Sequence, residues 1–219
     1  MASNGSKLST PGERSSASAP EQSEGLFRLV IGGAWRFAVV SLAAFSVWAF
    51  GSKWFRPIGG EPTMYAAIAV VFMGLSGLLM YPLMNRPRPI WSFYRAFMPA
   101  FFAYAAIWSA CWFGLGAGWG EWLGAALGGL AFVVLSAWHF ENWRGGWWAL
   151  AGFLVLHTLG YYLGGWSMGK LLVLARAGHL GGLDRSQGVT LAKLSWGLAY
   201  GLGFGGGTGW VFGWLRDRI

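Results

Sequence analysis

The stretch WGLAYGLGFGGGTGWVFGW (196–214) has glycine at every fourth position, at Gly197, Gly201, Gly205, Gly209 and Gly213. Residues four apart on an α-helix lie about 40° apart around its axis, so these glycines form one slowly winding stripe. Glycine in a helix costs about 1 kcal/mol relative to alanine, so the stripe needs a compensating interaction. In lipid, helices associate through close packing that small residues permit. The stretch is therefore predicted to be a transmembrane helix packed through its glycines.

The rest of the chain is apolar too, and its charged residues are grouped. Hydrophobic residues make up 55% of the 219 residues and charged residues 11%, whereas soluble domains carry about a quarter charged residues. Four stretches without a charged residue exceed the roughly 20 residues of a bilayer crossing; they are 62–85, 96–120, 145–169 and 194–215. Two shorter ones are 37–52 and 122–140. Six spans are therefore predicted.

The predicted fold is an all-α, polytopic transmembrane helix bundle that forms a single domain over residues 26–219. Its spans are expected near 30–50, 64–84, 97–115, 122–138, 147–166 and 194–214. Residues 1–25 are rich in serine, proline and glutamate, and are predicted to be a disordered cytoplasmic tail. In the long connection 167–193, the piece KLLVLARA (170–177) is expected to be an interfacial helix or an extension of the fifth span. Whether this connection enters the membrane stays open.

The distribution of basic residues predicts the orientation. Ten of the 16 Lys and Arg residues fall on the side of the membrane that holds the N-terminal tail and the C-terminus. Basic residues are more frequent in cytoplasmic loops, so both termini are expected in the cytoplasm. The protein is expected in the inner or plasma membrane. The loop that contains Arg86, Arg88 and Arg95 is expected to contact anionic lipid headgroups. The net charge of +8 is attributed to basic residues in loops that flank the membrane. No nucleic-acid partner is therefore predicted.

The glycine stripe allows two interpretations. It can pack helices within one bundle, which we favour, or it can form the interface of a homo- or hetero-oligomer. Gly124 and Gly128 repeat the four-residue spacing in the fourth span, and Gly160 and Gly164 repeat it in the fifth. Close helix packing is therefore expected at several places in the bundle.

Three polar residues are the candidates for a functional site: His157, His139 and Glu141. His157 lies near the middle of the fifth predicted span, where an ionisable side chain is costly to retain. His139 and Glu141 are expected at the end of the fourth span, about 10 Å from His157 in depth, which is too far for the two histidines to share one ion. No metal site is predicted, no cofactor is assigned, and the single Cys111 excludes an intramolecular disulfide.

Two short motifs resemble those of a known enzyme family. GLSG (74–77) and AGHLGG (177–182) are similar to the serine and histidine motifs of rhomboid intramembrane proteases. The resemblance implies Ser76 as nucleophile and His179 as base. The context differs from that family, because Ser76 lies midway along a predicted span and His179 lies in a loop. We therefore do not assign the chain to this family.

The sequence leaves three classes of function open. The favoured class is a non-catalytic structural or assembly subunit of a membrane, packed through glycine-rich helices. A small transporter or channel with His157 lining the path is the alternative. A membrane enzyme, with the Ser76 and His179 pair or a histidine-ligated cofactor, is the third.

Overall fold

The computed structural model describes residues 19–84, 90–116 and 118–216, and the helices in these ranges account for nearly all of them. The α-helices are α1 (Ala19–Phe55), α2 (Gly60–Met80), α3 (Ile90–Leu115), α4 (Trp119–His139), α5 (Gly146–Ala177) and α6 (Arg185–Arg216). Two single turns of 3-10 helix, Arg56–Ile58 and Tyr81–Leu83, follow α1 and α2. The all-α prediction is confirmed.

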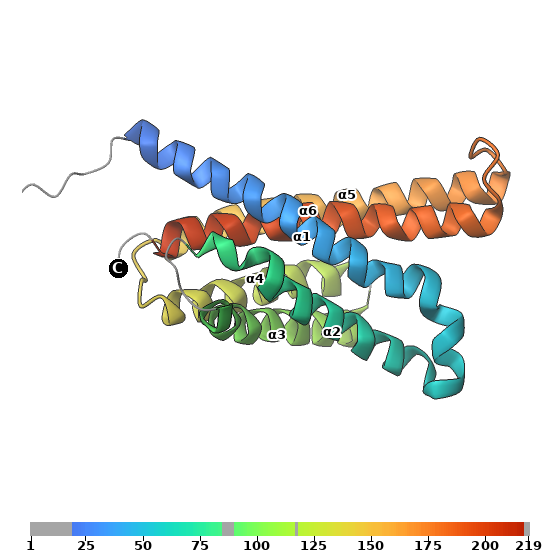
Figure 1. The fold of residues 1–219 in the computed structure, drawn as a ribbon, viewed down its shortest axis with the longest axis horizontal. Coiled ribbons are helices and arrows are strands. Elements are labelled where there is room, and N and C mark those ends of the chain that lie inside the picture. Colours follow the sequence, from blue (N-terminus) through green and yellow to red (C-terminus); the bar gives the residue numbers. More distant parts are fainter. Residues whose placement is uncertain (1–18, 85–89, 117, 217–219) are drawn as a thin grey trace, which may run out of the picture.

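The six helices alternate in direction along one long axis of the molecule. In Figure 1, α1 begins at the end of the molecule where α6 ends, so the described parts of the chain start and finish at the same end. We call this end the terminal end. It also holds the α4–α5 turn, and the α1–α2 and α5–α6 turns lie at the opposite end (Figure 1). This is the arrangement of an up-and-down bundle with an even number of helices.

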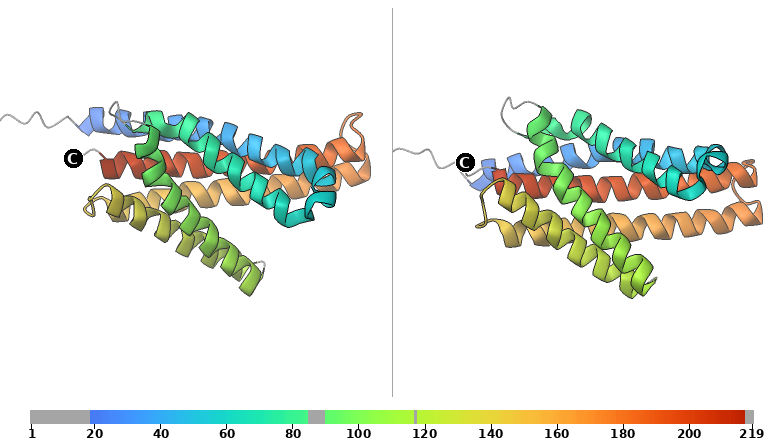
Figure 2. Two further views of the ribbon diagram at one scale, coloured as in Figure 1. Left: turned by 60° about the horizontal axis from the view of Figure 1, so that its bottom comes forward. Right: turned by 90° about the horizontal axis from the view of Figure 1, so that it is seen from below.

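Helix α6 is central, because it packs along both α1 and α5. Helix α2 packs on the outer side of α1, and α3 packs against α4. The α3–α4 pair runs obliquely to the other helices, and the turn between α3 and α4 diverges from them (Figure 2). The core is aromatic: Phe204 of α6 is fully buried and its ring contacts rings from α1, α3, α4 and α5.

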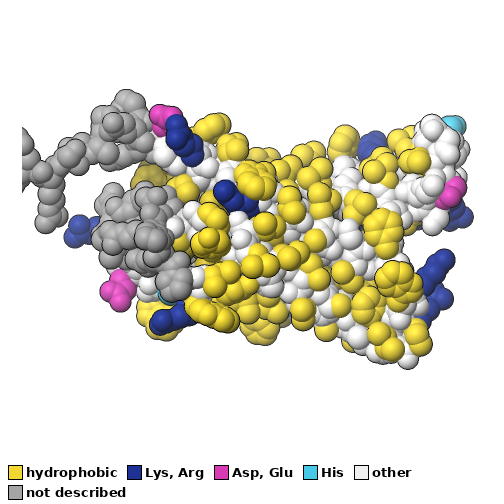
Figure 3. Space-filling view, in the orientation of Figure 1, with side chains coloured by type: hydrophobic (Ala, Val, Ile, Leu, Met, Phe, Trp, Pro, Cys, Tyr) yellow, Lys and Arg dark blue, Asp and Glu magenta, His cyan; other side chains and the backbone are white. Residues whose placement is uncertain are grey.

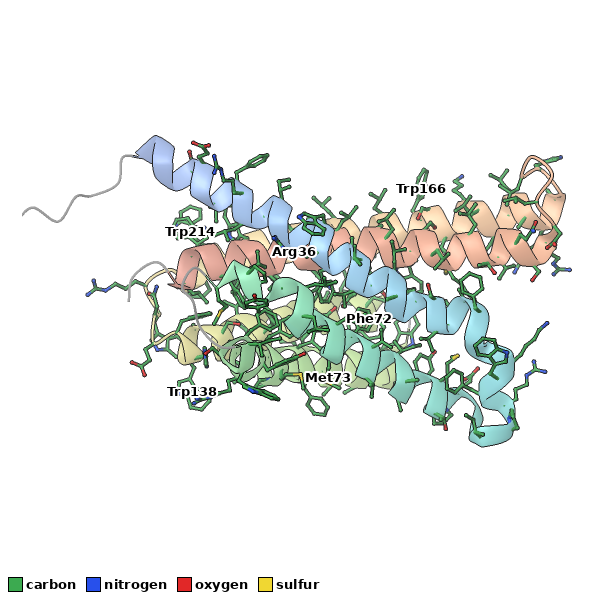
Figure 4. The ribbon with its side chains drawn as sticks, viewed as in Figure 1. Arg36, Phe72, Met73, Trp138, Trp166 and Trp214 are labelled. Atoms are coloured by element: carbon green, nitrogen blue, oxygen red, sulfur yellow. The ribbon has the colours of Figure 1, made fainter. Side chains whose placement is uncertain are left out.

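Within the described residues, four helical segments are long and apolar enough by composition to cross a membrane: Ser23–Gly51, Gly60–Leu83, Ile90–Leu115 and Trp119–His139. On the face shown in Figure 3, most charged side chains lie toward the two ends of the molecule, and hydrophobic side chains cover most of the area between them. Trp138 and Trp214 lie toward the terminal end (Figure 4), which is typical of indole rings at a membrane–water interface. The surface is thus suited to contact with lipid.

Two helices extend beyond the predicted segments. Helix α1 begins at Ala19, inside the stretch 1–25 that was predicted to be disordered, and residues 1–18 lie outside the described part of the chain. Helix α5 continues to Ala177, so the piece 170–177 extends the fifth helix. The long connection 167–193 is therefore mostly helical, and only residues 178–184 join α5 to α6.

Specific caps explain the short α5–α6 connection. Gly178 has a φ of 73°, in the left-handed region, and the His179 N–H donates to the Leu174 carbonyl, which ends α5. The Gln187 N–H donates to Asp184 Oδ1 at 2.8 Å, and the Asp184 N–H donates to Gln187 Oε1 at 3.0 Å. This reciprocal pair is a capping box, and it begins α6 at Arg185.

The structure places all five glycines of the stripe against α1 of the same chain. A Cβ at Gly201 would lie 2.6 Å from the Ala38 Cα, and a Cβ at Gly205 or Gly209 would collide with the carbonyl of Gly33 or Leu29. Gly197 faces the ring of Phe45, and Gly213 faces Leu26. The two backbones therefore approach more closely along this line than any larger residue would allow.

Glycines also lie at the contacts between the other closely packed pairs of helices. Between α5 and α6, a Cβ at Gly160 would lie 2.7 Å from the Gly203 Cα. Between α3 and α4, a Cβ at Gly124 would lie 3.1 Å from the Trp108 Cα, and a Cβ at Gly128 would lie 3.0 Å from the Tyr104 carbonyl oxygen. The second contact brings Tyr104 into the middle of the bundle.

Candidate functional site

The most buried ionisable side chain is His157, near the middle of the bundle. It is fully buried on α5, and its Nε2 lies 2.6 Å from the hydroxyl of Tyr104 on α3. Tyr104 is buried as well. A buried imidazole needs hydrogen-bond partners because its transfer out of water is otherwise costly. The Tyr104 hydroxyl supplies one such partner, and it joins α3 to α5.

Aromatic rings surround His157 on the remaining sides. The ring of Phe153 stacks on it at a centroid distance of 5.6 Å, and the ring of Tyr161 lies 6.1 Å away on the same helix. From α6, Tyr200 and Phe204 meet it edge-on at 6.0 and 5.9 Å. The spacing of four residues puts Phe153, His157 and Tyr161 on one face of α5, and this face is turned toward α3 and α6.

Three further polar side chains lie near the pair of Tyr104 and His157. The hydroxyl of Tyr161 donates to Glu121 Oε1 at 3.4 Å, and Glu121 is half-buried in the first turn of α4. Tyr200 of α6 places its phenol beside the imidazole, with its ring edge-on to that of His157 at 6.0 Å. We call Tyr104, Glu121, His157, Tyr161 and Tyr200 the polar cluster; α3, α4, α5 and α6 all contribute to it.

Several buried polar atoms in this region have no protein partner. Six such side-chain atoms occur among the described residues, and four of them belong to side chains whose rings contact Tyr161. The four are Trp108 Nε1, His157 Nδ1, Tyr162 Oη and Trp196 Nε1. Buried polar groups in proteins are normally hydrogen-bonded. Among the described residues, most of the unpaired buried polar side-chain atoms therefore belong to residues that surround Tyr161.

On the terminal side of His157 the bundle interior is mainly aromatic, and the buried hydroxyls of Ser136 and Thr208 donate to carbonyls of their own helices. The buried rings of Phe97, Phe101, Phe132, Phe153 and Phe204 contact one another there. Phe132 and Phe153 stack at 4.8 Å, and Phe132 meets Phe97 at 6.0 Å. The polar cluster therefore borders a layer of phenylalanine, which we call the phenylalanine layer.

The structure keeps His139 and Glu141 apart from His157. His139 is the last residue of α4 and its ring packs edge-on to Phe140 at 5.3 Å, while Glu141 is exposed in the α4–α5 turn with a φ of 52°. Within the described residues, no group of three or more His, Cys, Asp and Glu side chains is placed to hold a metal ion. Of the three predicted candidates, only His157 belongs to the polar cluster.

Ser76 and His179 are not brought together. Ser76 is buried near the end of α2, and its hydroxyl donates to the Phe72 carbonyl of its own helix. His179 is exposed in the α5–α6 turn, which lies at the end of the molecule opposite to the end of α2 (Figure 1). A nucleophile has to be within hydrogen-bonding reach of its base, so this pair has no catalytic geometry.

Of the three arginines expected to meet lipid headgroups, Arg95 is exposed in the second turn of α3. Arg86 and Arg88 lie outside the described residues. A further cation, Arg36, lies along α1 (Figure 4). It is half-buried, and its guanidinium donates to the Gly32 carbonyl at 3.1 Å and lies 4.7 Å from the Trp35 ring centre. The side chain is thus turned toward the terminal end, as expected for an arginine that reaches for the headgroups.

Four of the five residues of the polar cluster were not predicted from the sequence. Tyr104, Tyr161 and Tyr200 each stand within an apolar predicted span, and Glu121 was used only to bound one. Tyrosine in a span is normally an interfacial residue, but Tyr104 and Tyr200 lie near the middle of α3 and α6. Their position at the middle of a span, away from both interfaces, was the signal in the sequence that could have identified them.

Comparison of the chain with protein-family models, with curated proteins and with solved structures gave no match.

Proposed function

We propose that the chain is an integral membrane protein in which all six helices cross the bilayer. Helices α5 and α6 are not among the four segments that are apolar enough by composition alone, because glycine, tyrosine and other less apolar residues interrupt their hydrophobic stretches. Each has 32 residues, however, more than a crossing needs. Leu159 and Leu163 on α5 and Leu198 and Leu202 on α6 are exposed. Helix α6 also packs along α1, so the two helices share one environment.

Within this bundle, we propose a small transporter or channel whose path is lined by His157. The observation that carries the proposal is the full burial of His157, with Nε2 held by Tyr104 and Nδ1 without a protein partner. An ionisable residue inside a membrane bundle is costly, and it generally marks a pathway or a ligand site. The neighbouring unpaired polar atoms provide further groups that a polar solute can bind.

An assembly subunit, the class favoured from the sequence, has less support. This class is favoured by the lack of a paired acid–base or metal constellation in the sequence and by the small-residue surface of the helices. Four of the five glycines of the stripe, however, are buried under α1, with Gly213 half-buried. A second chain has no access to a surface that is covered in this way. The glycines instead serve to bring the helices of one chain close enough to form the polar cluster.

The proposal is tested with the purified protein in liposomes. Entry of small polar solutes, measured by light scattering of shrinking and swelling vesicles and by ion-selective dyes, should exceed that of protein-free vesicles. His157→Phe should abolish the excess, because it removes the buried polar group and fills the space with a ring. The matched control is His179→Phe, the same change at an exposed turn position, which should leave the flux unchanged. Equal flux through native and protein-free vesicles for every solute, protons included, would contradict the proposal.

A further inference from the structure

We propose that the solute is the proton, and that the polar cluster passes protons between Glu121 and His157; this inference rests on the proposed transport function. The cluster supplies one carboxylate, one imidazole and three phenols, and all of these groups exchange protons with hydrogen-bonded neighbours. No lysine or arginine has a described hydrogen bond or ring contact with any of them. The groups therefore suit a proton better than a larger anion, which would need a cationic partner.

The first step of the path is the contact between Glu121 and Tyr161. Glu121 is half-buried at the start of α4, so its carboxylate can take up a proton from the membrane surface on the side where α4 begins. Tyr161 lies deeper and its hydroxyl is bonded to Glu121 Oε1. Tyr161 passes a proton inward by releasing its own hydroxyl proton as it accepts one from Glu121, and the reverse exchange moves a proton outward.

The second step joins Tyr161 to His157. These residues are one turn apart on α5, with ring centres 6.1 Å apart, so the proton crosses through bridging water. A bound water needs two to four polar partners. His157 Nδ1, Trp108 Nε1, Tyr162 Oη and Trp196 Nε1 are buried, lack protein partners and belong to side chains around Tyr161. The Tyr161 hydroxyl and His157 Nδ1 are the two ends of this step, and the other unpaired atoms around Tyr161 offer further partners to the bridging water.

The third step takes place on the imidazole. The lone pair of Nδ1, which has no protein partner, accepts the proton and the neutral imidazole becomes imidazolium. Nε2 stays hydrogen-bonded to the Tyr104 hydroxyl at 2.6 Å and so keeps the ring in place. The groups that face His157 from every neighbouring helix are Tyr104 on α3, Tyr161 on α5 and Tyr200 on α6, with Glu121 on α4 behind Tyr161.

Beyond His157 the phenylalanine layer separates the polar cluster from the terminal end. Phenyl rings offer no proton-exchanging group, so a proton that reaches His157 leaves toward the terminal end only when this layer rearranges. In this structure the proton path therefore leads from the start of α4 to His157, and the phenylalanine layer closes it toward the terminal end. This asymmetry makes the transport step dependent on a conformational change rather than a continuous water-filled pore.

The test uses the full chain in liposomes that contain a pH-sensitive dye, with a potassium gradient and valinomycin to drive protons. Native protein should acidify the vesicles faster than protein-free controls. Tyr161→Phe removes one hydroxyl, keeps the ring and interrupts the first step, so the proton flux should fall to the protein-free rate. The matched control is Tyr94→Phe, which removes a hydroxyl that donates to the Gly74 carbonyl between α2 and α3, outside the cluster. It should leave the proton flux unchanged.

The outcomes separate this inference from the proposed function. Loss of proton flux in Tyr161→Phe and in His157→Phe, with Tyr94→Phe unaffected and all variants eluting as folded protein, supports the relay. Proton flux that survives Tyr161→Phe overturns it. Flux of another polar solute that depends on His157, without proton flux above background, also overturns the relay but leaves the transporter in place. No flux of any solute overturns both.

Discussion

Gly205 and Gly206 are neighbours on α6 with different surroundings, and they provide a matched test of the helix packing. A Cβ at Gly205 would collide with the Gly33 carbonyl and the Phe37 Cβ, whereas a Cβ at Gly206 would lie at 3.6–3.8 Å from Val30, Ala34 and Leu156. The first environment has no room for a methyl group, and the second offers ordinary van der Waals contact. The same substitution is therefore expected to have opposite effects at the two positions.

We predict that Gly205→Ala destabilises the protein by about 1–3 kcal/mol, because α1 has to move away from α6. Gly206→Ala should be neutral or stabilising by up to about 1 kcal/mol, since alanine is the better helix former. Thermal unfolding of both variants in the same detergent measures the difference. Equal melting temperatures would show that the contact between α1 and α6 does not depend on the glycine at 205.

At the scale of the elements, one side chain ties the α4–α5 turn to the end of α6. Asn142 is buried, and its Nδ2 donates to the Leu215 carbonyl at 2.9 Å, while the Arg144 N–H donates to its Oδ1 at 3.2 Å. The last carbonyls of a helix have no partner within the helix. Asn142 supplies one for α6, and it holds three helices together at the terminal end.

We predict that Asn142→Ala lowers the free energy of unfolding by about 1–3 kcal/mol, because a buried carbonyl of α6 loses its partner. Asn142→Asp is the sharper variant: it keeps the shape and the acceptor for Arg144 but cannot donate to Leu215. It should therefore be at least as destabilising as alanine. Melting curves in detergent give the comparison, and a stable aspartate variant would show that the donated bond contributes little.

At the scale of the whole molecule, the up-and-down order places both termini on one side if all six helices cross. Reporter fusions after Asn85 and at the C-terminus should then both report the cytoplasm, and a fusion after Gly118 should report the opposite side. A fusion after Gly181, in the α5–α6 turn, distinguishes six spans from four. It should match the Gly118 fusion if α5 and α6 cross, and the C-terminal fusion if only α1 to α4 do.

The sequence by itself determined the helical class, and the apolar stretches anticipated all six helices. Hydrophobic stretches and glycine spacing are local properties, so they can be read along one chain. The capping box at Asp184 and Gln187 was also readable from local spacing, but it was overlooked, and so the α5–α6 connection was predicted too long.

Only the tertiary structure decided which surfaces meet. The spacing of the stripe from Gly197 to Gly213 allows packing within one chain or against a partner chain, and only the tertiary structure shows that α1 of the same chain lies against these glycines. Likewise, His157 stood alone in the sequence, whereas Tyr104 is 53 residues away and Tyr200 lies on another helix. The physical reason is that a helix pattern specifies which residues share one face of that helix, while the contacts of the face depend on how all six helices pack together.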